Sequence, residues 1–146
     1  MSREGPPSRS GFFVWEPVEV RWGDMDAMGH VNNARFFTYC ESARIRYFSE
    51  VALEPVEAAP TAPLVVTAGC TFRRQVRFPA SLEVGVRCAR LGRTSFELAY
   101  GIFPAQGEEA VADGSSVVVW TEVASGRPVP LPAELRRRIG ALDGVG

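Results

Sequence analysis

The chain has 146 residues, of which 46% are hydrophobic, and it carries a formal net charge of −1 with a pI of about 5.9. This length and composition predict one domain with a substantial core. The near-neutral charge and the lack of a basic stripe with interleaved aromatic residues exclude a general attraction to nucleic acid or to a membrane surface. No apolar stretch reaches the roughly 18 residues that cross a bilayer.

The first ten residues are polar and rich in proline, serine and glycine. They lack the apolar segment of a secretory signal, so we expect a disordered tail over residues 1–10 and a single domain over 11–146. Three cysteines lie in apolar patterns, namely Cys40, Cys70 and Cys88. An odd number in such surroundings indicates reduced core residues rather than disulfides or metal ligands, which favours a cytoplasmic protein.

The first two predicted elements are a strand and a long helix. Residues 18–22 alternate between apolar and charged side chains, which predicts a strand that ends near Gly23. From Ala34 to Val51, apolar residues recur at helical spacing and spread far around the helix, which predicts that it is largely enclosed. Asn32 or Asn33 is its natural N-cap.

The rest of the chain reads mainly as strands. A proline-rich connection over 52–63 leads to a long strand over 64–78, with a bend or bulge near Phe72. Further strands are predicted over 82–88, 96–102 and 110–123, with a turn at 91–94 and a short helix over 133–142. This order predicts an α+β fold in which an antiparallel sheet wraps one helix, and its free edges favour a two-fold dimer.

Chemistry-bearing residues are concentrated between the first strand and the helix. Asp24, Asp26, His30 and two asparagines fall within ten residues there. The helix that follows begins with unpaired backbone N–H groups, and its dipole favours developing negative charge at that end. A carboxylate beside such an oxyanion site indicates acyl chemistry.

Four segments together resemble a known family: GDMDAMGHVNNARFFTYCESAR, FRRQVRFP, LGRTSFEL and SGRPVPLP. They are similar to the hot-dog-fold acyl-CoA thioesterases of the 4-hydroxybenzoyl-CoA thioesterase type. The HVNN form is particularly similar to bacterial long-chain acyl-CoA thioesterases and plant acyl-acyl carrier protein thioesterases. The resemblance extends over Val14–Arg138 and implies an antiparallel five- or six-stranded sheet around one long central helix. It also implies an acyl-CoA substrate, no metal or organic cofactor, and a homodimer or homotetramer with sites at the subunit interface.

The resemblance also implies roles for individual residues. The family's catalytic aspartate falls on Asp26, as a general base on water or as a nucleophile that forms a mixed anhydride. The backbone N–H that polarises the thioester carbonyl falls near Asn33, which agrees with the capping argument. His30 matches the histidine of the plant-type pattern, but Met28 replaces its asparagine. His30 is therefore open to three roles: orienting Asp26, binding the substrate carbonyl, or supporting the loop.

Plainer interpretations compete with these roles. Asp26 could serve only to accept hydrogen bonds from loop N–H groups, as aspartate often does in turns. Asp24 is expected to cap the backbone or pair with an arginine. Arg93 in the hairpin, and Arg74, are candidates to hold the phosphates of coenzyme A, against the alternative that they cover a solvated sheet edge.

Hydrolysis of acyl-CoA thioesters to free acid and CoA is the function that these patterns favour. Two alternatives remain: a hot-dog enoyl-thioester hydratase or dehydratase, and a non-catalytic acyl-thioester-binding module. Measuring both thiol release and enoyl-CoA hydration distinguishes a hydrolase from a hydratase or dehydratase. Binding of thioesters without thiol release would indicate the binding module.

Overall fold

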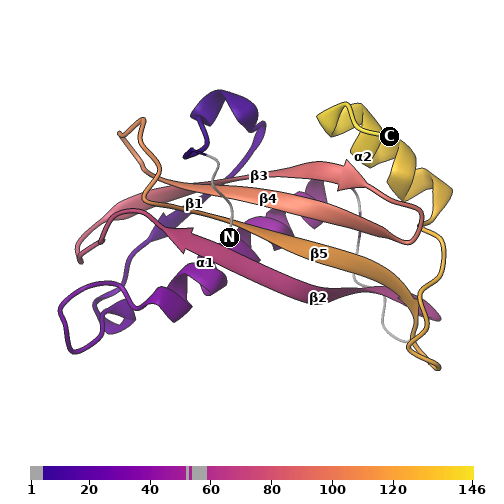
Figure 1. Ribbon diagram of the computed structural model, residues 1–146, viewed down its shortest axis with the longest axis horizontal. Helices are drawn as coiled ribbons and strands as arrows, with labels where there is room; N and C mark the ends of the chain where they lie inside the picture. The colour runs from indigo at the N-terminus through magenta and orange to yellow at the C-terminus, as the bar shows by residue number, and fades with distance from the viewer. Residues whose placement is uncertain (1–4, 52, 54–58) are drawn as a thin grey trace.

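A computed structural model describes residues 5–51, 53 and 59–146. Its elements are two 3-10 helices, five strands and two α-helices: η1 (Arg9–Gly11), β1 (Val14–Glu19), η2 (Trp22–Asp24), α1 (Asn33–Glu50), β2 (Thr61–Phe72), β3 (Ser81–Leu91), β4 (Ser95–Pro104), β5 (Ala112–Glu122) and α2 (Ala133–Asp143). The strands of this described part form one antiparallel sheet in the order β1-β3-β4-β5-β2, and α1 lies along one face (Figure 1). The α+β prediction is confirmed, with five strands.

The connections that the turn residues predict are present. β3 and β4 are joined within the predicted 91–94 turn, where the Gly92 amide donates to the Ser95 carbonyl at 2.7 Å. The strand predicted over 110–123 is β5, and the helix predicted over 133–142 is α2. Because β3, β4 and β5 are neighbours in both chain and sheet, this part of the topology follows from short connections.

The first strand lies earlier than the alternation predicts. β1 ends at Glu19 instead of near Gly23, because the chain turns at Arg21 into η2. Asp24 closes this turn by accepting a hydrogen bond from the Arg21 amide at 3.0 Å. Trp22, expected on the buried face of a strand, is 74% exposed. A local side-chain-to-backbone hydrogen bond therefore overrides the apparent period of two.

The strand predicted over 64–78 also differs in its limits. β2 begins at Thr61 and leaves the sheet after Phe72, where the sequence predicts a bend or bulge. The register shift in the sheet lies earlier, between Val65 and Thr67. The connection predicted over 52–63 is correspondingly shorter, and its residues 52 and 54–58 lie outside the described residues.

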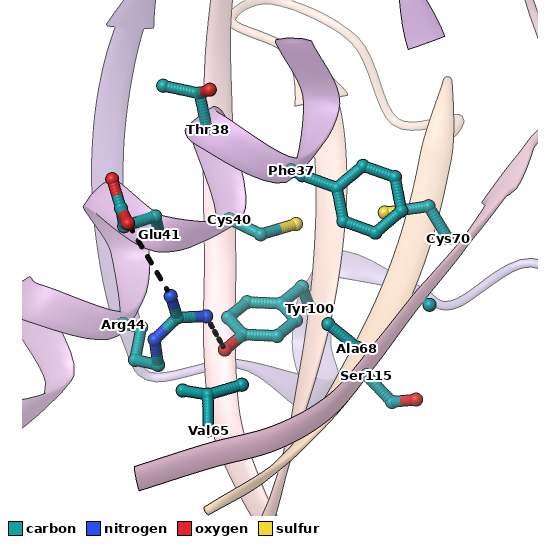
Figure 2. Close-up of a pocket in the computed structure, with 11 residues that line it drawn as sticks. Phe37, Thr38, Cys40, Glu41, Arg44, Val65, Ala68, Cys70, Tyr100 and Ser115 are labelled. Carbon is teal, nitrogen blue, oxygen red and sulfur yellow. Dashed lines mark hydrogen bonds and ion pairs between the residues drawn. The ribbon is translucent and has the colours of Figure 1, made fainter. Parts of the chain in front are cut away.

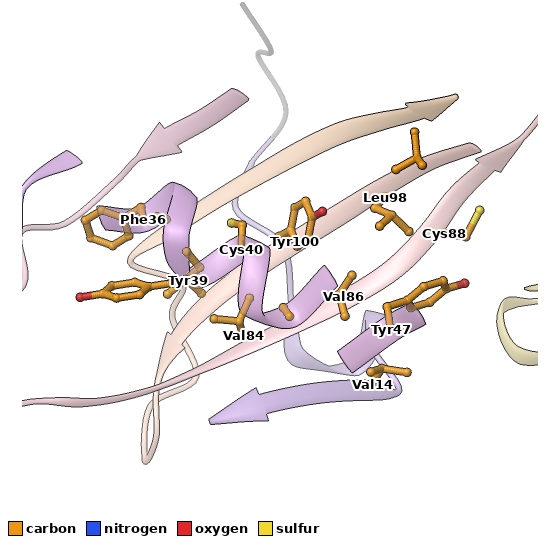
Figure 3. Packing of buried hydrophobic residues seen from close by; sticks show 14 of the residues in the cluster. Val14, Phe36, Tyr39, Cys40, Tyr47, Val84, Val86, Cys88, Leu98 and Tyr100 are labelled. Atoms are coloured by element: carbon orange, nitrogen blue, oxygen red, sulfur yellow. The ribbon is translucent and has the colours of Figure 1, made fainter. Parts of the chain in front are cut away.

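α1 supplies one side of the main core. Its buried side chains are Phe36, Tyr39, Cys40, Ala43 and Tyr47. They pack toward sheet residues that include Val84, Val86, Leu98 and Tyr100 (Figure 3). The prediction of a largely enclosed helix is wrong on one side, because Phe37 and Ile45 are exposed in the single chain.

The C-terminal helix is tied to both layers of the fold. Asp143 of α2 accepts hydrogen bonds from the Tyr47 hydroxyl at 2.5 Å and from the Cys88 amide at 2.8 Å. These bonds join α2 to α1 and β3. All three cysteines are free thiols, with Cys40 and Cys88 buried and Cys70 partly buried.

At the other end of the chain, Arg9 is held against the sheet. Its guanidinium donates to Glu83 and to the backbone carbonyls of Pro104 and Gly107, at 2.7–2.9 Å. Residues 1–4 of the tail predicted over 1–10 lie outside the described residues. Within the described ranges, neither helix is long and apolar enough to cross a membrane.

Candidate active site

The segment between η2 and α1 is a tight loop closed by backbone hydrogen bonds. The Asp26 amide donates to the His30 carbonyl at 2.9 Å, and the Gly29 amide donates to the Asp26 carbonyl at 3.0 Å. Gly29 has a φ of 82°, a conformation that glycine adopts without strain. The Val31 amide donates to the Val76 carbonyl at 2.8 Å, so the loop is fixed to the segment that follows β2.

Asp24 is a buried structural acid, as the sequence predicts. Its carboxylate accepts hydrogen bonds from the Tyr39 hydroxyl at 2.8 Å and from the amide and guanidinium of Arg21, and the Arg35 guanidinium lies 3.8 Å away. Burial opposes ionisation of Asp24, but these hydrogen bonds and the charge of Arg21 outweigh it and hold the pKa of the carboxyl below its ordinary value. The Asp24 carbonyl also accepts from the Asn32 amide at 3.0 Å. Asp24 therefore joins η2 to the start of α1.

A cavity of about 380 Å³ beside this loop collects the predicted site residues. Asp26, His30 and Asn33 all line it, together with Arg74. Asp26 is exposed there, and its Oδ1 accepts a 2.9 Å hydrogen bond from the Met28 amide. The turn-forming role considered for Asp26 is thus real. It leaves Oδ2 without a hydrogen bond from the described residues.

Asn33 is the first residue of α1, and Asn32 is the N-cap. The Asn32 side chain accepts a hydrogen bond from the Ala34 amide at 2.9 Å. The Asn33 amide donates to no other group in the described part of the chain, and Asn33 lines the cavity. The residue that carries this N–H, at the positive end of the helix dipole, therefore belongs to the cavity wall. Such an N–H is the donor that an acyl-transfer oxyanion requires.

His30 is half-buried on the same wall. No hydrogen bond joins its imidazole to Asp26 among the described residues, so the orienting role considered for His30 is not observed. Met28, at the position of the plant-type asparagine, lines the cavity and is 79% exposed. A thioether is only a weak acceptor, so Met28 cannot supply the amide donor of that pattern.

The two candidate phosphate-binding arginines lie in different places. Arg74 lines the cavity, where it forms an ion pair with Glu109. Arg93 lies in the β3–β4 turn near α2, at the opposite end of the sheet from the Asp26 loop (Figure 1). Its carbonyl accepts a hydrogen bond from the Leu131 amide at 3.0 Å. One chain therefore does not bring Arg93 to its own cavity.

Sequence reasoning proposed Arg74 for the wall formed by the end of β2 and the segment after it, but it missed Phe72 and Gln75 there. Phe72 and Gln75 line the cavity, and the ring of Phe72 meets that of Phe36 with centroids 5.5 Å apart. Arg73 also lines it and forms an ion pair with Asp113 of β5. The available signal was the change at Phe72 from an apolar strand to two arginines and a glutamine.

The fold and this cavity define the hot-dog thioesterase class, in which a five-stranded antiparallel sheet wraps a central helix. The chain matches the thioesterase-like superfamily over residues 20–139 and belongs to that family. The expected resemblance is therefore confirmed.

Three similar proteins illustrate this membership. The PA5185 protein of Pseudomonas aeruginosa strain PAO1 has a TM-score of 0.86 and 35% identity, over 94% of this chain and 96% of that one. A thioesterase of Thermus thermophilus, crystallised with coenzyme A and zinc, has a TM-score of 0.79 and 41% identity over 92% of this chain and 96% of that one. The chloroplastic acyl-acyl carrier protein thioesterase ATL3 of Arabidopsis thaliana is 26% identical over 127 residues, which cover 83% of this chain and 64% of that protein.

Within the described residues, no group of three or more histidine, cysteine, aspartate or glutamate side chains is placed to hold a metal ion. The polar side chains that line the cavity are those of Asp26, His30, Asn33, Gln75 and the two arginines, Arg73 and Arg74.

Proposed function

We propose that the protein hydrolyses acyl-CoA thioesters to the free acid and CoA at this cavity. The observation that carries the proposal is the convergence of Asp26 and the Asn33 amide on one cavity at the N-terminus of α1. A carboxylate and a backbone donor are the two groups that thioester hydrolysis needs. Membership of the thioesterase-like superfamily and the similarity to a thioesterase crystallised with coenzyme A support the same reaction.

In the proposed reaction, the Asn33 amide donates a hydrogen bond to the thioester carbonyl oxygen. Asp26 takes a proton from water as the water oxygen attacks the carbonyl carbon. The negative charge that develops on the carbonyl oxygen lies at the positive end of α1. The carbon–sulfur bond then breaks, and the CoA thiolate leaves with the proton from Asp26. His30 lines the same cavity and is available to contact the substrate.

A covalent route uses the same residues. Asp26 attacks the carbonyl carbon itself, the CoA thiolate leaves, and water then hydrolyses the mixed anhydride. Label that enters Asp26 during a single turnover in oxygen-18 water demonstrates the covalent route, whereas label in the acid alone also arises when water attacks the acyl carbon of the anhydride. Direct attack by water puts the label in the released acid, whereas attack of water on the Asp26 carboxyl carbon of the anhydride puts the label in Asp26.

A second copy of the chain completes the proposed site. β2 is an edge strand whose apolar residues Leu64, Val65 and Val66 are exposed, beside the exposed Phe37 and Ile45 of α1. Such an edge pairs favourably with a copy of itself about a two-fold axis. When the two β2 strands pair antiparallel, the start of β2 in one subunit lies beside the end of β2 in the other. This pairing therefore brings the β3–β4 turn of the partner subunit, with its candidate phosphate-binding arginine, toward the Asp26 end.

The experiment that tests the function is a screen of thiol release over aromatic, short, medium and long acyl-CoAs, with acyl-acyl carrier proteins in parallel. Enoyl-CoA hydration is measured in the same samples. Thiol release with no hydration supports hydrolysis. Hydration without thiol release, or binding of thioesters with neither reaction, overturns the proposal in favour of a hydratase or a binding module.

A further inference from the structure

A second cavity, of about 210 Å³, lies farther along α1, between the helix and β2 (Figure 2). Phe37, Cys40 and Arg44 face it from α1, Val65 and Cys70 from β2, and Tyr100 from β4. Thr38, Glu41 and Ser115 also line it, so apolar and aromatic walls are interrupted by polar groups. Arg44 is the one cationic side chain among the described residues that line this cavity.

Arg44 is unusual in being a mostly buried arginine with weak partners. Its side chain is only 14% exposed. Within the described residues, its polar contacts are a long 3.3 Å hydrogen bond to the Tyr100 hydroxyl and the Glu41 carboxylate at 3.9 Å (Figure 2). A guanidinium carries five N–H donors in a rigid fork, and burying it is costly unless those donors are used. Arg44 therefore has donors to spare for a ligand.

The Tyr100 hydroxyl is itself fixed, because it shares a 2.7 Å hydrogen bond with the Ser116 hydroxyl in the buried core. This bond holds the phenol where the Arg44 guanidinium reaches it. A restrained guanidinium binds a planar anion with less loss of side-chain freedom than a solvated one. The Arg44 end of the cavity is thus a prepared anion site.

The two cavities follow one another along the same two elements. On α1, Asn33 lines the first cavity and Arg44 lines the second. The two residues are three helical turns apart, which places them about 16 Å apart along the helix axis and on the same face. On β2, Phe72 lines the first cavity, whereas Cys70 and Val65 line the second. An acyl chain that runs along α1 from the Asn33 amide to Arg44 must therefore pass the contact between the rings of Phe36 and Phe72.

We infer that Arg44 selects acyl thioesters whose chain ends in a carboxylate, so that the substrate class is an ω-carboxyacyl-CoA of medium chain length. This inference rests on the proposed function. The carboxylate accepts two parallel hydrogen bonds from the guanidinium, the strongest form of this contact. The methylene chain lies against the apolar walls. The exposed Glu41 competes for Arg44 and weakens the preference without cancelling it.

The test compares octanoyl-CoA with suberoyl-CoA, its ω-carboxy counterpart of equal carbon number. Thiol release gives the ratio of kcat/KM values for the wild-type protein. Titration calorimetry gives the ratio of binding constants on Asp26→Asn, which is expected to turn over at least about 100-fold more slowly. The wild-type protein is expected to favour suberoyl-CoA by about tenfold or more. Arg44→Met should remove that preference in both measurements.

Two further variants keep the test decisive. Glu41→Gln, at an exposed position, should raise the preference for suberoyl-CoA, which a purely structural Arg44 would not predict. Arg46→Met on the same helix, where Arg46 pairs with Glu16 outside the cavity, should leave the ratio unchanged.

The outcomes separate the two proposals. Absence of thiol release from every thioester of the acyl screen would overturn the hydrolase assignment, while the ratio of the two binding constants would still test the role of Arg44. Equal binding of the two thioesters by the wild-type protein, or a suberoyl preference that survives in Arg44→Met, would overturn the role of Arg44.

Discussion

The Tyr39 hydroxyl donates a 2.8 Å hydrogen bond to Oδ2 of Asp24, and this bond ties the η2 turn to the second turn of α1. Burial and the neighbouring carboxylate both raise the pKa of Tyr39, so its hydroxyl stays protonated and keeps donating. Asp24 and Asp26 lie two residues apart with opposite roles. The first is buried and fully engaged in structure, and the second is exposed in the cavity.

Stability should therefore depend on Asp24 and not on Asp26. Asp24→Ala leaves the Tyr39 hydroxyl without its buried acceptor, and we expect a loss of about 3 kcal/mol of unfolding free energy. Asp26→Ala should change it by less than about 1 kcal/mol, because Asp26 is exposed. Urea unfolding of both variants measures the difference. Equal losses would mean that the assignment of roles within this pair is wrong.

Acid stability should carry the signature of Asp24. Its pKa is lowered in the folded state from the ordinary 3.8, so the unfolded chain binds the proton more readily. The stabilisation is present above pH 3.8 and is lost as the pH falls through the lower folded value. Urea unfolding from neutral pH downward should show a steeper acid decline for the wild-type protein than for Asp24→Asn. Parallel declines would show that Asp24 does not contribute.

The role of the Asn33 backbone can be separated from that of its side chain. Asn33 is the first residue of α1, a position where proline is well tolerated, and Asn32 already has the extended backbone that precedes proline. Asn33→Pro should keep the fold but remove the N–H, lowering kcat for thiol release by about 100-fold. Asn33→Ala retains the N–H and is the matched control, expected to stay within a few-fold of the wild-type protein. Similar losses in both variants would assign the effect to the side chain.

The proposed dimer depends on the apolar edge of β2. Val66→Lys places a charge on that exposed edge and should shift the protein toward a monomer of 15.9 kDa, with loss of activity. Val123→Lys, also at an exposed valine but beyond the end of β5, should change neither. Light scattering after size exclusion measures the mass. A Val66→Lys protein that keeps the wild-type mass would place the interface elsewhere.

Much of the fold was accessible from the sequence because its signals were local. The turn before Ser95 and the helix around Tyr39 and Cys40 follow from period and turn chemistry. The limits of β1 were missed because the bond from the Arg21 amide to Asp24 turns the chain where alternation still suggests a strand. Exposure of Ile45 was missed because apolar spacing does not say which surface covers a helix.

Apart from Arg74, the candidate site was predictable only on the side that lies in one continuous segment. Asp26, His30 and Asn33 are close in sequence, so one loop and one helix start suffice to gather them. Phe72 and Gln75 join them through the pairing of β2 at the far edge of the sheet, a long-range arrangement that no local pattern encodes.

The account depends most on Asp26, and Asp26→Asn tests it most directly. The substitution keeps the side-chain shape and the acceptor for the Met28 amide, but removes the negative charge that activates water or forms the anhydride. Thiol release from the best acyl-CoA should fall by at least about 100-fold, with the oligomer and the urea midpoint unchanged. A folded Asp26→Asn protein that turned over every cleaved acyl-CoA at the wild-type rate would contradict the proposed mechanism.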